Sequence, residues 1–307
     1  MQAPSSPDAR RGLVYAFAAY GAWGVFPLYF KALRAVDAPE ILAHRVAWSA
    51  VFLAGVVTVQ RRWKEFVRAF GTLRSVGTYA LSTAFVTTNW LFYIWAVLAD
   101  HVLDASLGYF MNPLVNVLLG AMFLRESLRP RQAMAVALAA LGVLLLVLRV
   151  GHFPWLALTL AFSFGSYGLV RKWAGIDPVV GLLVETSLLA PLAAGLIAWR
   201  GWRGTGGLGH DTTTTVLCLL AGVITAMPLI WFAHGVRNLR LATMGLVQFV
   251  TPTLQFLCAV LLFREPFTVA HAVAFGCIWG SLVIYTADAF WGAPMAKVAE
   301  RAVEENR

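Results

Sequence analysis

Long runs of apolar residues, each about the length of a bilayer-spanning helix, recur along almost the whole chain. The run Ala133–Leu148, AMAVALAALGVLLLVL, contains no polar side chain at all. Windows of about 20 residues, broken at charges and turn residues, predict an all-α integral membrane protein with ten transmembrane helices. These helices are expected at residues 12–33, 38–60, 75–98, 102–124, 130–149, 152–172, 178–199, 213–236, 242–263 and 268–290.

The composition supports a membrane protein over a soluble one. Of 307 residues, 60% are hydrophobic and 13% are charged, whereas a soluble domain carries about 25% charged residues. The three cysteines, Cys218, Cys258 and Cys277, lie inside apolar segments and are interpreted as small buried hydrophobic residues. No metal site and no cofactor is therefore expected.

The basic residues indicate an orientation in the membrane. If the N-terminus is cytoplasmic, 17 Lys and Arg fall on the inner side and 6 on the outer side, with Arg45 inside a helix. This positive-inside bias predicts that the tails, residues 1–11 and 291–307, are both cytoplasmic. Although the net charge is +9, its spread over short loops argues against a nucleic-acid partner. The first apolar stretch contains Pro27 and has no small-residue cleavage site, so we expect a retained helix rather than a signal peptide.

The two halves of the chain resemble each other. The strings LRE (124–126) and FRE (263–265) follow Pro113 and Pro252 by the same interval, and YGAWG (20–24) resembles FGSYG (164–168). The period of about five helices predicts two repeats, 12–149 and 152–290, the second inverted in the membrane.

Longer strings match a known family. The segments AAYGAWGVFPLYFK, EILAHRVAWS, NWLFYIWAV, ASLGYFMNPLVN, LAFSFGSYGLVRK and RLATMGLVQFVTPTLQFL closely resemble the RarD group of EamA-type permeases, in the drug/metabolite transporter superfamily. The resemblance implies ten helices in two inverted five-helix halves, with helices 1, 3, 4, 6, 8 and 9 around a central cavity and helices 5 and 10 outside it. It also implies export of a small solute across a bacterial inner membrane.

Polar and aromatic side chains inside the spans are candidates for the cavity lining. On helix 4, Tyr109, Asn112 and Asn116 share one face, and on helix 9 Gln248, Thr251 and Gln255 share another, because their spacings are three and four residues. Interhelical hydrogen bonding is the alternative role for both stripes. Helical spacing also selects five residues of helices 1, 3 and 6, for which core packing is the alternative: Tyr20, Trp23, Asn89, Tyr93 and Tyr167.

Ionisable groups in the spans are functional candidates because burying them is costly. Glu185 is the one carboxylate deep in an expected span, so it is the candidate for proton coupling; a structural hydrogen bond is the alternative. His44 and Arg45 lie near the outer end of helix 2. Arg45 is expected to be structural, bonding backbone carbonyls or the loop carboxylates Asp100 or Asp104. Its alternatives are contact with an anionic substrate and snorkelling to the surface.

The favoured function is a secondary transporter of a small amphipathic or drug-like solute that works by alternating access. No Walker motif, HExxH or GxSxG motif occurs, which argues against an ATP-driven pump and against an enzyme. A membrane-embedded sensor or scaffold is the alternative. The expected partners are the small-molecule substrate and the lipid bilayer, with the chain acting as a monomer.

Overall fold

The computed structural model describes residues 7–123, 130–150, 153–174, 177–239, 244, 247–285 and 287. Within these ranges the regular secondary structure is helical, with no strand. Seven described helices are long and apolar enough to cross a membrane, and Val250–Leu262 and Val269–Tyr285 are shorter apolar helices. The chain therefore has the helices of a multi-pass membrane protein.

The helix boundaries follow the expected segments closely. They are α1 (Pro7–Gly24), α2 (Phe26–Ala32), α3 (Ala38–Val59), α4 (Trp63–Ala69), α5 (Leu73–Leu98), α6 (Val102–Phe123), α7 (Pro130–Val150), α8 (Trp155–Ala174), α9 (Pro178–Trp202), α10 (Thr212–Asn238), α12 (Val250–Leu257) and the π-helix η1 (Cys258–Leu262). The start of the segment expected at 242–263 and the end of the one at 268–290 lie outside the described residues, as do the tails up to residue 6 and beyond residue 287.

Arg10–Ala32 is one candidate span, as expected at 12–33, but two features of these segments were not expected. The single helix expected at 12–33 is divided at Val25 into α1 and α2, because Pro27 has no N–H to continue the hydrogen-bond ladder and sits instead in the first turn of α2. The loop expected after residue 60 contains α4, a helix of 7 residues that is too short for a spanning-length window to detect.

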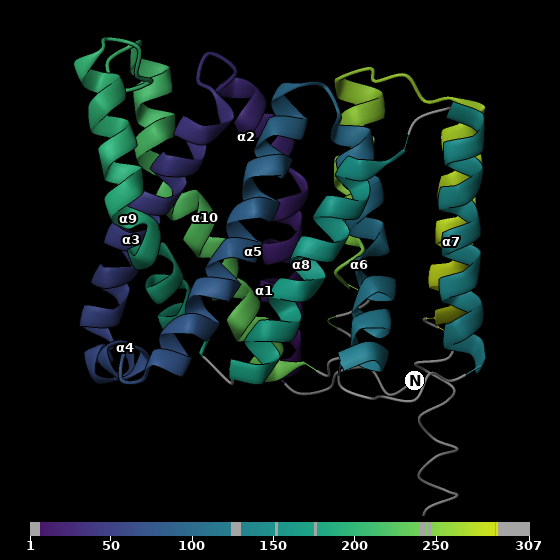
Figure 1. The fold of residues 1–307 in the computed structure, drawn as a ribbon, viewed down its shortest axis with the longest axis horizontal. Helices are drawn as coiled ribbons and strands as arrows, with labels where there is room; N and C mark the ends of the chain where they lie inside the picture. Colours follow the sequence, from purple (N-terminus) through teal and green to yellow (C-terminus); the bar gives the residue numbers. More distant parts are fainter. Residues whose placement is uncertain are drawn as a thin grey trace, which may run out of the picture.

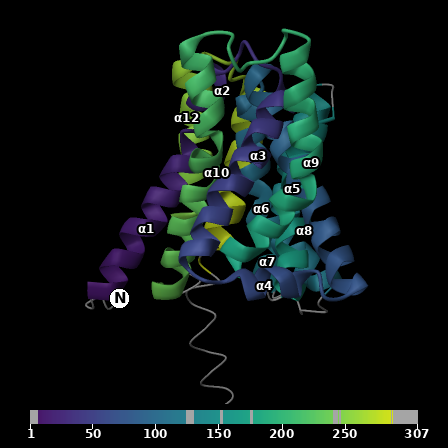
Figure 2. The ribbon, with the colours of Figure 1, turned by 90° about the vertical axis from the view of Figure 1, so that its left-hand side faces the viewer.

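The helices stand side by side as a bundle, with α9 at one edge and α7 and Val269–Tyr285 at the other (Figure 1). Helices far apart in sequence pack together: α3 on α9, α6 on α8, α1 and α3 on α10, and α5 on α8. In both views α4 lies at the same end of the bundle as the N-terminal end of α1 (Figure 2). The arginines that begin α1 and those around α4 are therefore on one side.

Small residues let the main helix pairs cross closely. A Cβ atom at Gly222 of α10 would lie 2.2 Å from the carbonyl carbon of Trp48 in α3, and one at Gly108 of α6 would lie 2.6 Å from the carbonyl oxygen of Ala157 in α8. Glycine is needed at both crossings because any side chain would push the two helices apart.

The bundle end opposite α4 is held by polar contacts between its loops and helix ends. Lys31 pairs with Asp100, and Arg200 pairs with Asp37. The buried carboxylate of Glu265 accepts hydrogen bonds from the backbone N–H groups of Val102 (2.8 Å) and Leu103 (2.7 Å), so it caps the N-terminus of α6.

Candidate functional site

One cavity of about 520 Å³ lies among the helices and is lined mainly by aromatic and neutral polar side chains. Its walls come from α1, α2, α3, α5, α6, α8, α9, α10 and α12 together with Gln248; among the described residues, neither α7 nor Val269–Tyr285 contributes. The volume is within the range of about 300–1,000 Å³ that is typical of small-molecule sites.

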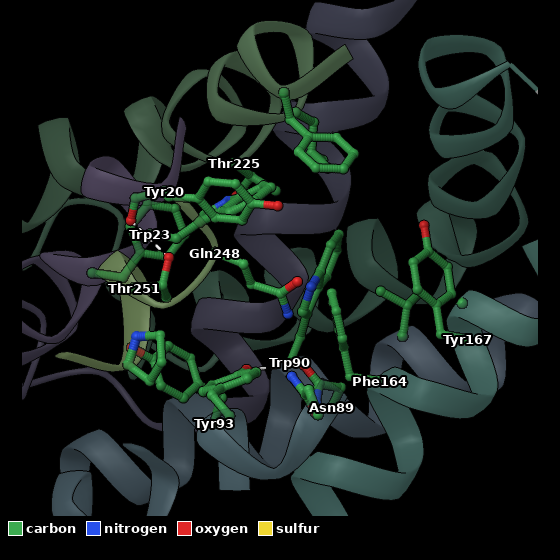
Figure 3. A pocket seen from close by; sticks show the side chains of 18 of the residues that line it. Tyr20, Trp23, Asn89, Trp90, Tyr93, Phe164, Tyr167, Thr225, Gln248 and Thr251 are labelled. Atoms are coloured by element: carbon green, nitrogen blue, oxygen red, sulfur yellow. Dashed lines mark hydrogen bonds between the residues drawn. The ribbon is translucent and has the colours of Figure 1, made fainter. Parts of the chain in front are cut away.

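The cavity brings together ten of the eleven lining candidates selected from the sequence: Tyr20, Trp23, Asn89, Tyr93, Tyr109, Asn112, Tyr167, Gln248, Thr251 and Gln255. Figure 3 shows Tyr20, Trp23 and Thr251 on one wall and Phe164 and Tyr167 on another, with Gln248 and Trp90 between them. Asn116 is not among the lining residues. Its amide oxygen lies 3.3 Å from where a Cβ of Gly165 would be, so it faces α8.

Sequence reasoning missed several lining residues. Trp90, Phe164 and Phe232 are aromatic residues in apolar helices, where the pattern of neighbouring residues does not distinguish a cavity wall from a packing surface. Thr225 lines the cavity at mid-helix in α10, and Gly168 lines it on α8. Helical spacing from Tyr167 and Phe164 could have suggested this face of α8.

Hydrogen bonds hold much of the polar lining in place. Thr251 Oγ1 donates to the carbonyl oxygen of Tyr20 (2.7 Å), and Gln255 Nε2 donates to that of Trp23 (3.3 Å), which ties α12 to α1. On the other side, Tyr109 OH donates to Asn89 Oδ1 (3.0 Å), while Asn89 Nδ2 donates to the carbonyl oxygen of Leu160 in α8 (3.0 Å). Both alternatives for the stripes therefore apply at once, since these side chains join helices and line the cavity.

Three buried polar atoms of the lining have no hydrogen-bond partner within the described structure. They are Tyr93 OH, Asn112 Oδ1 and Gln255 Oε1. Buried polar atoms are ordinarily paired, so these three are exceptions among the lining residues.

Arg45 has partners other than the expected loop carboxylates. Its Nε donates to Thr225 Oγ1 (3.0 Å) across the crossing of α3 and α10, and its guanidinium carbon lies 4.4 Å from the centre of the Trp90 ring. Asp100 pairs instead with Lys31, and Asp104 with His101. Thr225 is one turn beyond Gly222, where a Cβ would lie 2.2 Å from the Trp48 carbonyl carbon, so Arg45 bonds α10 beside a close crossing of the two helices.

His44 is not among the residues that line the cavity. Its Nδ1 accepts a hydrogen bond from Trp48 Nε1 (3.2 Å), and its Nε2 lies 3.7 Å from Glu40 Oε1. The same Glu40 oxygen accepts from the backbone N–H of Gly207 (2.6 Å). His44 and Glu40 thus join α3 to the loop between α9 and α10.

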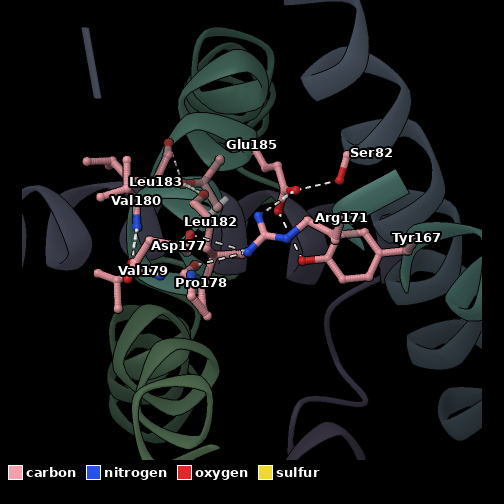
Figure 4. A network of polar contacts seen from close by, with 11 residues as sticks. Ser82, Tyr167, Arg171, Asp177, Pro178, Val179, Val180, Leu182, Leu183 and Glu185 are labelled. Atoms are coloured by element: carbon pink, nitrogen blue, oxygen red, sulfur yellow. Dashed lines mark hydrogen bonds and ion pairs between the residues drawn. The ribbon is translucent and has the colours of Figure 1, made fainter. Parts of the chain in front are cut away.

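Glu185 of α9 lies at the centre of a polar network that joins three helices. Its carboxylate accepts hydrogen bonds from Ser82 of α5 (2.5 Å), Tyr167 of α8 (3.3 Å) and Arg171 of α8 (3.1 Å), as Figure 4 shows. Arg171 also donates to the backbone carbonyl of Pro178 (3.4 Å) at the start of α9. Arg171 lies at the end of the segment expected at 152–172, and its position in the sequence does not indicate this ion pair.

Comparison with known proteins identifies the family. The model of the EamA-like transporter family matches residues 10–148. A protein of Vibrio cholerae named "Uncharacterized transporter" is 44% identical, covering 97% of this chain and 98% of its own. "Protein RarD" of Salmonella typhi is also 44% identical, over 92% of this chain and 97% of its own. The chain belongs to the EamA-like transporter family, in its RarD group.

A solved structure shares the fold. It has a TM-score of 0.56 and 19% sequence identity, and the match covers 89% of this chain and 96% of that one. Likeness at this identity concerns architecture alone. A further relative, "Chloramphenicol-sensitive protein RarD" of Pseudomonas aeruginosa, is 31% identical over 89% of this chain and 93% of its own.

Proposed function

We propose that this EamA-like protein is a secondary transporter that exports a small amphipathic metabolite or drug-like solute by alternating access around the cavity. The observation that carries the proposal is the cavity itself, because helices of both halves of the chain enclose one space of ligand size. Prolines lie inside three of the cavity helices, at Pro113 of α6, Pro191 of α9 and Pro228 of α10. The first span is interrupted at Val25, between α1 and α2, and interrupted helices at a central site are typical of carriers built from inverted repeats.

The pairing of helices supports ten spans in two inverted halves. If α1, α3, α5 and α6 of the first half correspond to α8, α9, α10 and α12 of the second, the main packed pairs have counterparts. The contact of α1 with α10 corresponds to that of α8 with α5, and the contact of α12 with α1 corresponds to that of α6 with α8. We place the protein in a bacterial inner membrane as a monomer with both termini in the cytoplasm.

Glu185 is the candidate for coupling transport to protons. Its carboxylate joins α9 to α5 and α8 at the end of the cavity where Arg171 and Pro178 lie. Protonation would neutralise Glu185 and weaken its attraction to Arg171, which would allow α8 and α9 to separate. In this mechanism proton binding opens the inner end of the cavity.

Counterflow of radiolabelled solutes in proteoliposomes tests the transport function. Gly168 lines the cavity on α8, and a Cβ atom there would meet nothing within 4 Å, so Gly168→Trp fills the cavity without forcing helices apart. Gly195 of α9 is exposed, and a Cβ there also meets nothing within 4 Å, so Gly195→Trp is the matched control.

We expect counterflow of at least one solute in a panel of metabolites and drugs, loss of it in Gly168→Trp and retention in Gly195→Trp. If no solute exchanges, or if Gly168→Trp exchanges as fast as the wild type, the cavity is not a transport site. A sensor or scaffold would then be the better assignment.

A further inference from the structure

The charges around the cavity are unbalanced. The charged side chains among its lining residues are Arg45 and Arg171, and no carboxylate lines it within the described part of the chain. Arg171 is compensated by Glu185, whose carboxylate lies 3.1 Å away. Arg45 has no carboxylate within 4 Å among the described residues, although its exposed fraction is only 4%. The cavity therefore carries one positive charge without a counter-charge.

The surroundings of Arg45 leave its terminal nitrogens available. Within the described structure, Nε is the nitrogen that makes a hydrogen bond, to Thr225, while the two Nη groups make none. The guanidinium is held in orientation by the Trp90 ring at 4.4 Å and the Phe30 ring at 5.3 Å. A guanidinium so fixed presents its two Nη groups as a planar donor pair, which matches the two oxygens of a carboxylate.

A buried charge without a partner is costly. Joining α3 to α10 through Thr225 does not require a charged side chain. A hydroxyl or amide at this position could bond Thr225 without that cost. The uncompensated charge of Arg45 points to an occupant that carries negative charge.

We propose that the transported solute is a monoanion, a carboxylate on an aromatic or aliphatic body, and that Arg45 binds its carboxylate. The inference rests on the proposed transport function and specifies its substrate class. A single uncompensated charge selects for one negative charge, since a dianion would leave an excess inside the cavity. Trp23, Trp90, Phe164 and Phe232 supply apolar surface for the body of the solute.

The test uses pairs of probes that differ in charge and little else. Each pair is a carboxylate and its amide, such as 3-phenylpropanoate with 3-phenylpropanamide, and hexanoate with hexanamide. Binding is measured by calorimetry on the purified protein in detergent, and transport by counterflow in proteoliposomes. We expect at least one carboxylate to bind tenfold or more tightly than its amide, and to exchange.

Variants then assign the preference to Arg45. Arg45→Gln should lose the tenfold preference, so that the acid binds no more tightly than its amide. Arg45→Lys should lose part of it, because the charge remains but the donor pair does not. Arg34→Gln removes an equal charge from an exposed site and should leave the preference intact. If Arg45→Gln fails to fold, the preference of the wild type and its partial loss in Arg45→Lys still test whether Arg45 binds the carboxylate.

Equal binding of every acid and its amide, or an unchanged preference in Arg45→Gln, would overturn the proposal. If an amide shows counterflow, Gly168→Trp abolishes that counterflow and no acid is preferred, the protein is a transporter whose substrate is not an anion. Loss of counterflow for every solute would instead remove the transport function.

Discussion

At the scale of single residues, the stripes were predictable and the partners of the charges were not. Asn112 and Thr251 could be selected because a helix fixes the direction of side chains three and four residues apart. The partner of Arg45, by contrast, depends on which helix crosses α3 and how closely. Gly222 and Thr225 determine this, and they are 177 and 180 residues away in sequence. The same holds for Arg171, whose carboxylate partner lies on the next helix.

Replacement of the carboxylate by an amide tests the coupling role of Glu185. In Glu185→Gln the side chain keeps its size and can still accept from Ser82, but it cannot take up a proton. We expect accumulation driven by a pH gradient to be abolished, while counterflow, which needs no proton movement, continues. Uptake into proteoliposomes with and without an imposed gradient measures both.

The control for this variant is Ser82→Ala, which removes one hydrogen bond and leaves the carboxylate able to titrate. It should keep gradient-driven accumulation. Accumulation by Glu185→Gln at the wild-type level would assign Glu185 a purely structural role.

At the scale of helices, hydropathy located the long elements but not their interruptions. A window of spanning length averages over Val25 and Pro27, so it could not separate α1 from α2. It also passes over α4, whose 7 residues carry charges at Lys64, Glu65 and Arg68. The crossings that bring the cavity walls together depend on glycines whose role becomes visible only when the opposite backbone is known.

The crossing of α3 and α10 predicts a strong effect of a side chain at Gly222. In Gly222→Val the added carbons would overlap the Trp48 backbone, because a Cβ there lies 2.2 Å from its carbonyl carbon. Such overpacking costs about 1–3 kcal/mol or more, so we expect a clearly lower melting temperature in detergent.

Gly55→Val on the exposed side of α3, where a Cβ meets nothing within 4 Å, is the matched control and should melt near the wild-type temperature. Similar melting of the two variants would mean that the helices do not cross as closely as the structure has them.

The N-terminus of α9 predicts a dependence of stability on pH. Burial acts to raise the pKa of Asp177, but the hydrogen bond from Arg62 and those from the backbone N–H groups of Val180 and Val179 outweigh it and lower the pKa. A carboxyl whose pKa is lower in the folded state stabilises the fold above its unfolded pKa, about 3.9, and loses that contribution as pH falls through the folded value.

Asp177→Asn should therefore lower the melting temperature at pH 7 and flatten its decline between about pH 5 and pH 3. Glu65→Gln is the comparison, since Glu65 also pairs with Arg62 but caps no helix, and it should have the smaller effect. If the melting temperatures of Asp177→Asn and the wild type fall in parallel with pH across this range, Asp177 is not the group that causes the decline.

At the scale of the whole molecule, the sequence could predict an all-helical, multi-pass membrane protein but not the shape that its helices enclose. The distribution of Lys and Arg needs only the order of segments, whereas the cavity depends on how α5, α8 and α10 lean against one another. The structure adds one observation to the charge argument. Because α4 and the N-terminal end of α1 lie at the same end of the bundle, the arginines of both share one side (Figure 2).

This arrangement makes the orientation testable with single cysteines in a background where Cys218, Cys258 and Cys277 are replaced. Arg68 of α4 is exposed at the end of the bundle that we place in the cytoplasm, and His101, also exposed, precedes α6 at the other end. An impermeant thiol reagent added to intact cells should label His101→Cys and leave Arg68→Cys unlabelled until the inner membrane is permeabilised, because positively charged loops are retained inside. Labelling of Arg68→Cys alone in intact cells would show the opposite orientation. The end of the cavity beside Arg171 and Glu185 would then face the outside.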